Sequence, residues 1–259
     1  MDTKLIILAG GLGSRISEES YNKPKPLIEI GGKPIIWHIM KYYSSFGINN
    51  FVICCGYKGY LLKEYFSNYF LHTSDVTFEL NSNRSIFHES KTEPWKVSLI
   101  DTGEHSMTGD RLKKIGHLLN KNEVFCMTYG DGLSNVNIAR LLDFHKKSKK
   151  IATVTAVLPP GRFGSLQING DMVEKFVEKP KSGSGYINGG FFVLNESVLS
   201  FIKGNNIAFE QKPLQVLALK DELSAFKHDG FWQPMDTLRE KNYLNDLWIS
   251  KKAPWKVWD

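Results

Sequence analysis

A glycine-rich stretch directly after the first apolar run constrains the fold of this chain more than any other feature. Residues 4–8 predict a strand, and Leu-Ala-Gly-Gly-Leu-Gly-Ser-Arg follows at positions 8–15. Three glycines let backbone N–H groups surround phosphate oxygens, and in an open α/β sheet such a loop lies at the carboxyl edge of the strands. The stretch lacks the Gly-Lys-Ser/Thr of a P-loop, and Ile16 stands where the dinucleotide fingerprint needs its third glycine. A phosphate-binding loop of another kind and a purely structural turn therefore both stay open.

Apolar runs alternate with amphipathic segments along most of the chain, which favours βα units around one sheet. We expect strands at residues 4–8, 50–55, 124–129, 151–157, 164–168, 172–177 and 187–194, and helices at 34–46, 60–70, 111–119, 138–147, 195–202, 213–220 and 237–250. Residues 71–107 interrupt this order with a polar, aromatic stretch that has strand-like pieces at 76–80 and 97–101, which predicts an inserted excursion. Without a repeat or linker, the chain is expected to form a single α/β domain over residues 1–259, with a mostly parallel mixed sheet flanked by helices.

The charge balance and the short N-terminal apolar run exclude several classes of protein. The 33 Lys and Arg exceed the 27 Asp and Glu, which favours phosphate-bearing partners. The lysines at 146–150 are typical of a solvated helix end, so we expect no nucleic-acid partner. The apolar residues 5–9 are too few for a secretory signal or a membrane helix, which predicts a cytoplasmic protein without a membrane partner. Cys54, Cys55 and Cys126 have neither disulfide nor zinc spacing and are expected to be buried thiols.

Two cations near the glycine loop strengthen the phosphate interpretation. Arg15 ends the loop, and Lys25 follows in the segment Lys-Pro-Lys-Pro at positions 23–26, whose prolines exclude a long helix. A guanidinium grips phosphate oxygens as a fork, whereas an ammonium acts as a compact charge at one phosphate. Arg15 and Lys25 together therefore suit a triphosphate, while Lys23 is expected to face solvent.

The glycine loop and the Lys-Pro that follows it resemble the signature of the sugar-phosphate nucleotidyltransferases, and the resemblance extends from Lys4 to Trp258. It implies a Rossmann-like nucleotidyltransferase fold, with a β-rich sugar-binding part over about residues 158–236. The further motifs that carry it are Met-Thr-Gly at 107–109 with Arg111, Tyr-Gly-Asp-Gly at 129–132, Pro-Pro-Gly-Arg-Phe-Gly at 159–164, Glu-Lys-Pro at 178–180, Ile-Asn-Gly-Gly-Phe-Phe at 187–192 and Phe-Trp-Gln-Pro-Met-Asp-Thr at 231–237.

The resemblance implies transfer of a nucleotidyl group to a sugar 1-phosphate with release of pyrophosphate. A sugar phosphate is already an anionic nucleophile, so alignment and charge neutralisation suffice for catalysis. The implied catalytic residues are Arg15, which would hold the departing phosphates, and Lys25, which would stabilise the α-phosphate. The implied metal is Mg²⁺, held by Asp131 and Asp236, since Mg²⁺ needs only one or two carboxylates beside substrate phosphates. From position alone, Asp236 could instead cap the helix that begins near Leu238.

The resemblance also implies two sets of binding residues. For the nucleotide these are Leu8, Ala9, Gly10, Gly11, Leu12, Gly13, Ser14, Arg15, Lys25, Ser106, Arg111 and Gly130. For the sugar these are Gly164, Glu178, Lys179, Asn188, Gly189 and Trp232. Arg111 could otherwise be a surface helix residue, and Trp232 could belong to the core. The chain departs from the family pattern at Ser14, where threonine is expected, and at Asp110, where glycine is usual and the carboxylate adds negative charge near the implied base pocket.

Within the family, the motifs fit members that use CTP and α-D-glucose 1-phosphate, which implies CDP-glucose as a product that leads to CDP-dideoxyhexoses and O-antigen. A thymidylyl- or uridylyltransferase on a hexose 1-phosphate is the nearest alternative. A non-catalytic, nucleotide-sugar-binding regulatory subunit is the alternative from another class, although such a subunit has no need of the full set Arg15, Lys25, Asp131 and Asp236. The resemblance further implies a homo-oligomer such as a hexamer, with residues 71–107 available for contacts between subunits.

Overall fold

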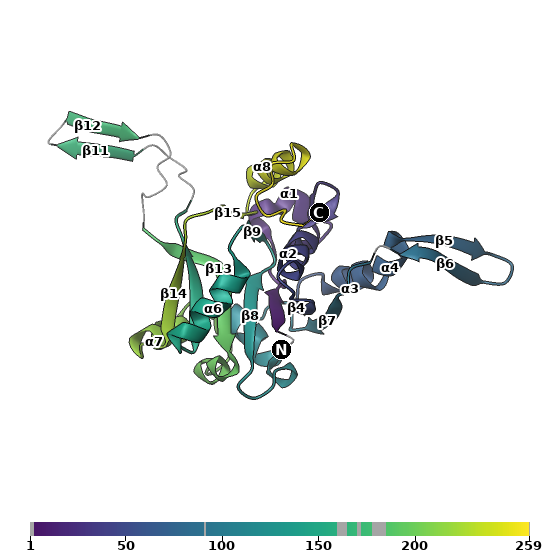
Figure 1. The fold of residues 1–259 in the computed structure, drawn as a ribbon, viewed down its shortest axis with the longest axis horizontal. Coiled ribbons are helices and arrows are strands. Elements are labelled where there is room, and N and C mark those ends of the chain that lie inside the picture. The colour runs from purple at the N-terminus through teal and green to yellow at the C-terminus, as the bar shows by residue number, and fades with distance from the viewer. Residues whose placement is uncertain (1–2, 91, 160–164, 170–171, 178–184, 259) are drawn as a thin grey trace.

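The central strands are mostly apolar, and both faces of their sheet are covered. The computed structural model describes residues 3–90, 92–159, 165–169, 172–177 and 185–258. Across its seven-stranded sheet the order is β14 (Leu223–His228), β10 (Ala152–Val157), β13 (Ile187–Asn195), β8 (Val124–Tyr129), β1 (Lys4–Leu8), β4 (Asn50–Cys55) and β7 (Lys96–Asp101) (Figure 1). β13 runs antiparallel to both of its neighbours, and the other paired strands are parallel. The expected mostly parallel mixed sheet is therefore confirmed.

Helices on the two faces of the sheet divide the core into two clusters. In β1, Leu5 and Ile7 belong to one cluster, whereas Ile6 and Leu8 belong to the other. The first cluster takes side chains from α2 (Ile35–Ser44), α6 (Ile138–Ser148) and α8 (Leu238–Ile249). The second takes them from α5 (Thr108–Lys114) and α7 (Lys212–Leu219). Parallel strands buried on both faces appear in sequence as continuous apolar runs, which is why β1 and β4 coincide with the predicted strands.

The inserted excursion is shorter than the predicted 71–107. After α3 (Gly59–Ser67) and α4 (Tyr69–Thr73), the strands β5 (Ser74–Glu79) and β6 (Arg84–Ser90) form a separate two-stranded ribbon that projects from the body of the molecule (Figure 1). The strand expected at 97–101 does not belong to this excursion. It is the edge strand β7, paired with β4, because Val97 and Leu99 pack against the main core.

Short helices and strands make up the other elements of the described part of the chain. These are η1 (Ser14–Ile16), α1 (Ser17–Ser20), η2 (Lys25–Leu27), β2 (Glu29–Ile30), β3 (Lys33–Pro34), η3 (Gly116–Leu118), β9 (Gly132–Ser134), β11 (Ser165–Asn169), β12 (Met172–Val177), η4 (Glu196–Phe201) and β15 (Trp232–Pro234). The helix expected at 195–202 is thus a 3₁₀ helix, and the strand β14 was not expected. Within the described ranges, no helix combines the length and the apolar composition that crossing a membrane requires.

Candidate active site

A cavity of about 630 Å³ opens at the carboxyl ends of β1 and β8. This is the edge at which open α/β sheets bind ligands. The glycine loop after β1 and the segment Tyr129–Asp131 at the end of β8 form part of its wall. The complete lining is Leu8, Ala9, Gly10, Gly11, Leu12, Gly13, Arg15, Lys25, Pro26, Ser106, Met107, Thr108, Arg111, Tyr129, Gly130, Asp131, Ala208, Glu210, Trp232, Pro234 and Asp236. Most residues expected to bind the nucleotide are therefore gathered around one cavity.

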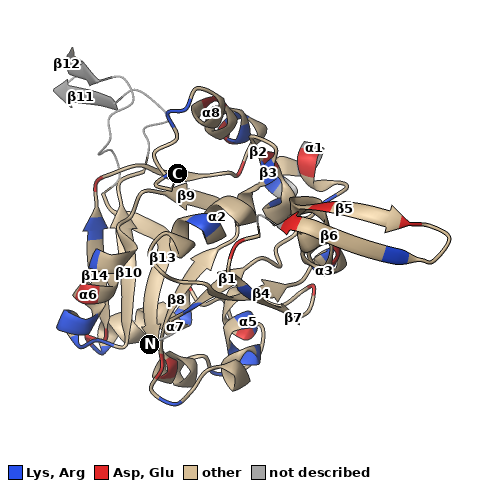
Figure 2. Cartoon of the chain, turned by 45° about the vertical axis from the view of Figure 1, so that its right-hand side comes forward, with Lys and Arg blue, Asp and Glu red and all other residues tan. Residues whose placement is uncertain are grey.

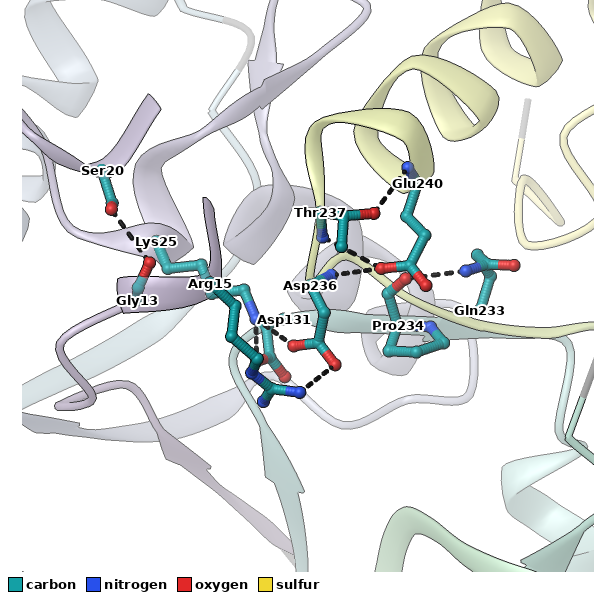
Figure 3. Close-up of polar contacts among 10 residues, drawn as sticks. All are labelled: Gly13, Arg15, Ser20, Lys25, Asp131, Gln233, Pro234, Asp236, Thr237 and Glu240. Carbon is teal, nitrogen blue, oxygen red and sulfur yellow. Dashed lines mark hydrogen bonds and ion pairs between the residues drawn. The ribbon is translucent and has the colours of Figure 1, made fainter. Parts of the chain in front are cut away.

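Four charged side chains meet in this cavity (Figure 3). The ammonium of Lys25 lies 2.6 Å from Asp131 Oδ2 and 2.7 Å from Asp236 Oδ1. The guanidinium of Arg15 lies 2.7 Å from Asp236 Oδ2. The Lys25 side chain is only 9% exposed, whereas that of Arg15 is 73% exposed. The two expected catalytic cations and the two expected metal ligands thus form one chain of ion pairs, with Arg15 at its solvent side.

Strand pairing brings the two aspartates together although they lie far apart in the sequence. Asp131 precedes β9 and Asp236 follows β15, and these short strands pair with Gly132 opposite Pro234. The Met235 N–H also donates to the Asp131 carbonyl, at 2.8 Å. The carboxylates consequently reach the same side of the cavity and share the Lys25 ammonium.

Asp236 does not cap α8, so its carboxylate is available to the cavity. Thr237 is the N-cap, and its hydroxyl accepts a hydrogen bond from Glu240 N at 3.3 Å. Glu240 Oε2 in turn accepts from the backbone N–H groups of Asp236 and Thr237, at 2.8 and 3.0 Å. Such a capping box satisfies the first N–H groups of the helix without the Asp236 side chain.

Arg111 lies under the glycine loop, with 4% of its surface exposed. Its two terminal nitrogens donate to the carbonyl oxygens of Gly10, Cys55, Gly103 and Glu104 and to the hydroxyl of Thr102. Burial lowers the pKa of the guanidinium. A side chain at position 10 would collide with this guanidinium, which explains the glycine there. Arg111 is thus a buried residue that holds the loop, and its expected contact with a base stays a prediction.

Some of the other expected site residues lie near the cavity, and others lie outside the described residues. Asn188 Nδ2 lies 3.4 Å from the Tyr129 hydroxyl, and Trp232 Nε1 donates to the Gly189 carbonyl at 2.7 Å. These residues, which were expected to bind the sugar, therefore adjoin the cavity wall. Ser106 donates to the Thr102 carbonyl at 2.5 Å. Ser14 begins η1, and its side chain lies outside the described part. Gly164, Glu178 and Lys179 lie outside the described residues.

Glu210 is a lining residue that the sequence did not reveal. Its Oε1 accepts from the Tyr129 hydroxyl at 2.5 Å, and its Oε2 accepts from the Thr108 hydroxyl at 2.6 Å. Burial, followed by the charge of Glu210, raises the pKa of Tyr129, so this hydroxyl remains a proton donor. No local pattern around position 210 distinguishes this glutamate from a surface residue. Only the pairing of the 207–210 segment with α5 places it in the cavity.

Asp131 and Asp236 fit a divalent cation as a pair. Both already contact one cationic nitrogen, so their oxygens converge on a single position. Among the residues placed by the structure, no group of three or more His, Cys, Asp and Glu side chains could enclose a metal ion. Two carboxylates are nevertheless enough for Mg²⁺, which keeps waters and takes its other oxygens from substrate phosphates.

This chain is similar to one protein family model, to several named proteins and to a solved structure. The nucleotidyl transferase family model matches residues 4–233. The glucose-1-phosphate cytidylyltransferase of Salmonella typhimurium is 58% identical over 256 residues, covering 99% of this chain and all of the relative. A probable glucose-1-phosphate cytidylyltransferase of Bacillus subtilis is 40% identical and covers 98% of this chain. The crystal structure of HddC from Yersinia pseudotuberculosis, 21% identical, superimposes with a TM-score of 0.68 over 95% of this chain and 99% of that chain.

Proposed function

Because the chain belongs to the nucleotidyl transferase family, we propose that it transfers the cytidylyl group of CTP to α-D-glucose 1-phosphate, giving CDP-glucose and pyrophosphate. The observation that carries this proposal is the 58% identity to a glucose-1-phosphate cytidylyltransferase over essentially the full length of both chains. The convergence of Arg15, Lys25, Asp131 and Asp236 in one cavity supports it, because a site for two phosphate-bearing substrates needs such charges.

The reaction is an exchange at the α-phosphorus of CTP. An oxygen of the sugar phosphate forms a bond to this phosphorus while the bond to the β-phosphate oxygen breaks, and the electron pair leaves with pyrophosphate. The nucleophile already carries negative charge, so no side chain has to remove a proton from it. The protein's task is to align the two phosphates and neutralise their charges.

We assign these tasks to the cations of the cavity. Lys25 would contact the α-phosphate, and the exposed Arg15 would hold the β- and γ-phosphates. In the structure both cations are paired with these aspartates, Lys25 with Asp131 and Asp236 and Arg15 with Asp236. Phosphate oxygens would replace these partners when CTP binds, which frees the two carboxylates to hold Mg²⁺. The metal ion would supply positive charge to the triphosphate.

We place the nucleotide along the glycine loop, with Leu8 to Ser14 and Gly130 approaching through backbone groups and Ser106 and Arg111 on the base side. We place the glucose phosphate near Asn188, Gly189 and Trp232, and assign Gly164, Glu178 and Lys179 to the same subsite. A carboxylate can accept bonds from two sugar hydroxyls, and an amide can both donate and accept. CTP as substrate further favours a cytoplasmic location.

Pyrophosphate release tests the proposal directly. Purified protein is incubated with glucose 1-phosphate, Mg²⁺ and CTP, dTTP or UTP in separate reactions. We expect rapid release with CTP, little with the other two, and none when the metal is chelated. A preference for dTTP or UTP would show that the base assignment is wrong. Absence of turnover with every triphosphate would favour a non-catalytic, nucleotide-sugar-binding protein.

A further inference from the structure

Glu210 is an unusual residue for a cavity that is to receive a triphosphate. Among the described residues, three carboxylates line this cavity, and Asp131 and Asp236 are both paired with cations. Among the residues that the structure describes, Glu210 has only the neutral hydroxyls of Thr108 and Tyr129 as partners. An unpaired negative charge repels phosphates, so this wall must face another part of the substrate.

Hydrogen bonds between the segment 207–210 and the start of α5 fix the position of Glu210. The Gly109 N–H donates to the Ile207 carbonyl at 2.9 Å, and the Phe209 N–H donates to the Thr108 hydroxyl at 2.8 Å. Asp110 Oδ2 accepts from the Ile207 N–H at 3.1 Å. These bonds attach the segment 207–210 to the start of α5, and the hydroxyls of Thr108 and Tyr129 hold the carboxylate itself.

The remaining bonding capacity of Glu210 defines the chemistry of its ligand. A carboxylate only accepts hydrogen bonds, and each of its oxygens can accept more than one. Each Glu210 oxygen accepts one hydrogen bond from a hydroxyl of the protein, so each can accept a further hydrogen bond from the substrate. The neighbouring lining residues Met107 and Ala208 are apolar, which suits the flat face of a base. A hydrogen-bond donor at the edge of a base fits both the free acceptor capacity and these apolar neighbours.

We propose that Glu210 is a specificity-determining residue, whose carboxylate accepts a hydrogen bond from the exocyclic amine of cytosine. This inference rests on the proposed cytidylyl transfer. Cytosine carries a donor at this position, whereas uracil and thymine carry a carbonyl oxygen. A carboxylate attracts the first group and repels the second, so Glu210 both favours CTP and rejects UTP and dTTP.

Glu210→Gln tests the assignment with little change of shape. We expect the ratio of kcat/KM for CTP to kcat/KM for UTP to fall about tenfold or more, since one well-placed contact to a base edge supplies discrimination of that order. Glu64→Gln, the same chemical change at an exposed position of α3, should leave the ratio unchanged. An unchanged ratio in a folded Glu210→Gln protein would overturn the inference. So would a loss of discrimination between CTP and dCTP alone, because the carboxylate would then contact the ribose.

A change in the ligand gives an independent measurement. The probe is the ribonucleoside triphosphate of 2-pyrimidinone, which is CTP without the exocyclic amine. Wild-type protein should use this probe at least about tenfold less well than CTP, whereas Glu210→Gln should show a much smaller difference, since the losses from two interacting partners do not add. Equal use of both triphosphates by the wild type would overturn the inference even if the variant did not fold.

Binding separates failure of this inference from failure of the proposed function. Calorimetric titration with CDP and UDP requires no turnover. If the wild type released no pyrophosphate, the cytidylyl transfer would be refuted, and a preference for CDP that Glu210→Gln abolishes would still support the role of Glu210. Equal affinity of the wild type for CDP and UDP would overturn it.

Discussion

Lys25 lies buried between two carboxylates, and this placement determines what its loss should do. Lys25→Ala removes the cation assigned to the α-phosphate, and loss of one such charge-stabilising group lowers kcat by about 100-fold or more. Without Lys25, the aspartates can still be reached by solvent, and Asp236 keeps its ion pair with Arg15. We therefore expect the melting temperature to change by only a few degrees. Steady-state pyrophosphate release and thermal unfolding check the two parts.

Lys23 provides the matched control for Lys25. It lies two residues earlier, and its ammonium pairs with Glu29 at 3.1 Å outside the cavity lining. Lys23→Ala should therefore keep kcat within about twofold, because exposed ion pairs contribute little. Normal turnover by Lys25→Ala combined with a collapsed melting temperature would show that Lys25 is a structural residue only.

Arg111 holds the glycine loop in shape and has no assigned contact with the transferring phosphate. Lysine at this position keeps the charge but offers one nitrogen in place of the two that serve five acceptors. Arg111→Lys should lower the free energy of unfolding by about 2 kcal/mol, since buried acceptors lose their donors. It should also raise KM for CTP, because the Gly10 carbonyl is released. Urea unfolding and initial rates measure both effects, and the exposed Lys113→Ala serves as control.

Asp110 shows why a residue's neighbours can change its interpretation. From the sequence, this carboxylate adds negative charge near the base pocket. In the structure it accepts bonds from the backbone N–H groups of Met107 and Ile207, at 3.4 and 3.1 Å, and does not line the cavity. Its charge is thus directed at the N-terminus of α5, where an anion is favourable.

At the scale of elements, strands buried on both faces were predictable and strands defined by their partner were not. β1, β4 and β8 are apolar runs that need no knowledge of the fold. β6 is polar and outside the core, so only its pairing with β5 identifies it. The same limit applied to the site. The motifs indicated Lys25, Asp131 and Asp236, whereas Glu210 depends on contacts between distant segments.

His38 joins α2 to the C-terminal segment, and its burial predicts that the stability of the fold depends on pH. Its Nε2 donates to the Ile30 carbonyl at 2.8 Å, and its Nδ1 accepts from Trp255 Nε1 at 3.3 Å. This arrangement needs a neutral ring, and burial lowers the pKa of His38 from 6.5 to about 4. As the pH falls through 6.5, His38 binds a proton in the unfolded chain but stays neutral in the folded chain. The stabilisation is therefore complete above pH 6.5 and is lost as the pH falls toward 4.

We therefore expect the free energy of unfolding to fall by about 2 kcal/mol from His38 between pH 7 and pH 5, in addition to other titrating groups. Urea unfolding across this range measures the slope. His38→Gln should be less stable at pH 7 and show a shallower dependence on pH. His72→Gln, on the short helix α4, should keep the wild-type slope. Parallel curves for wild type and His38→Gln would contradict this role.

At the scale of the whole molecule, the net charge of +6 is a poor guide to function. Figure 2 shows basic and acidic segments interspersed over the drawn elements. Among the residues that line the cavity, the cations are Arg15, Lys25 and Arg111, and one of these is committed to backbone carbonyls. The proposed phosphate contacts depend on the positions of a few cations rather than on the surplus.

The ribbon β5–β6 is the part of the molecule least explained by a single chain. It projects from the body in Figure 1, and Phe78, Leu80 and Phe87 are 53%, 89% and 42% exposed. Phe87 contacts Phe70 at 4.9 Å between ring centroids, and the strands otherwise pair only with each other. An isolated two-stranded ribbon is marginally stable in water, and clustered exposed apolar side chains mark interfaces.

We propose that a second copy of this chain covers the ribbon, so that the protein is a homo-oligomer. Light scattering should give a mass several times that of one chain, and Phe78→Ser combined with Phe87→Ser should shift it toward the monomer. Leu219→Ser, which changes a side chain that is 87% exposed on α7, should leave the mass unaltered. A monomeric wild type, or an unchanged mass in the double variant, would contradict this assignment. Because the ribbon lies outside the cavity lining, pyrophosphate release should show whether the separated chains keep a working site.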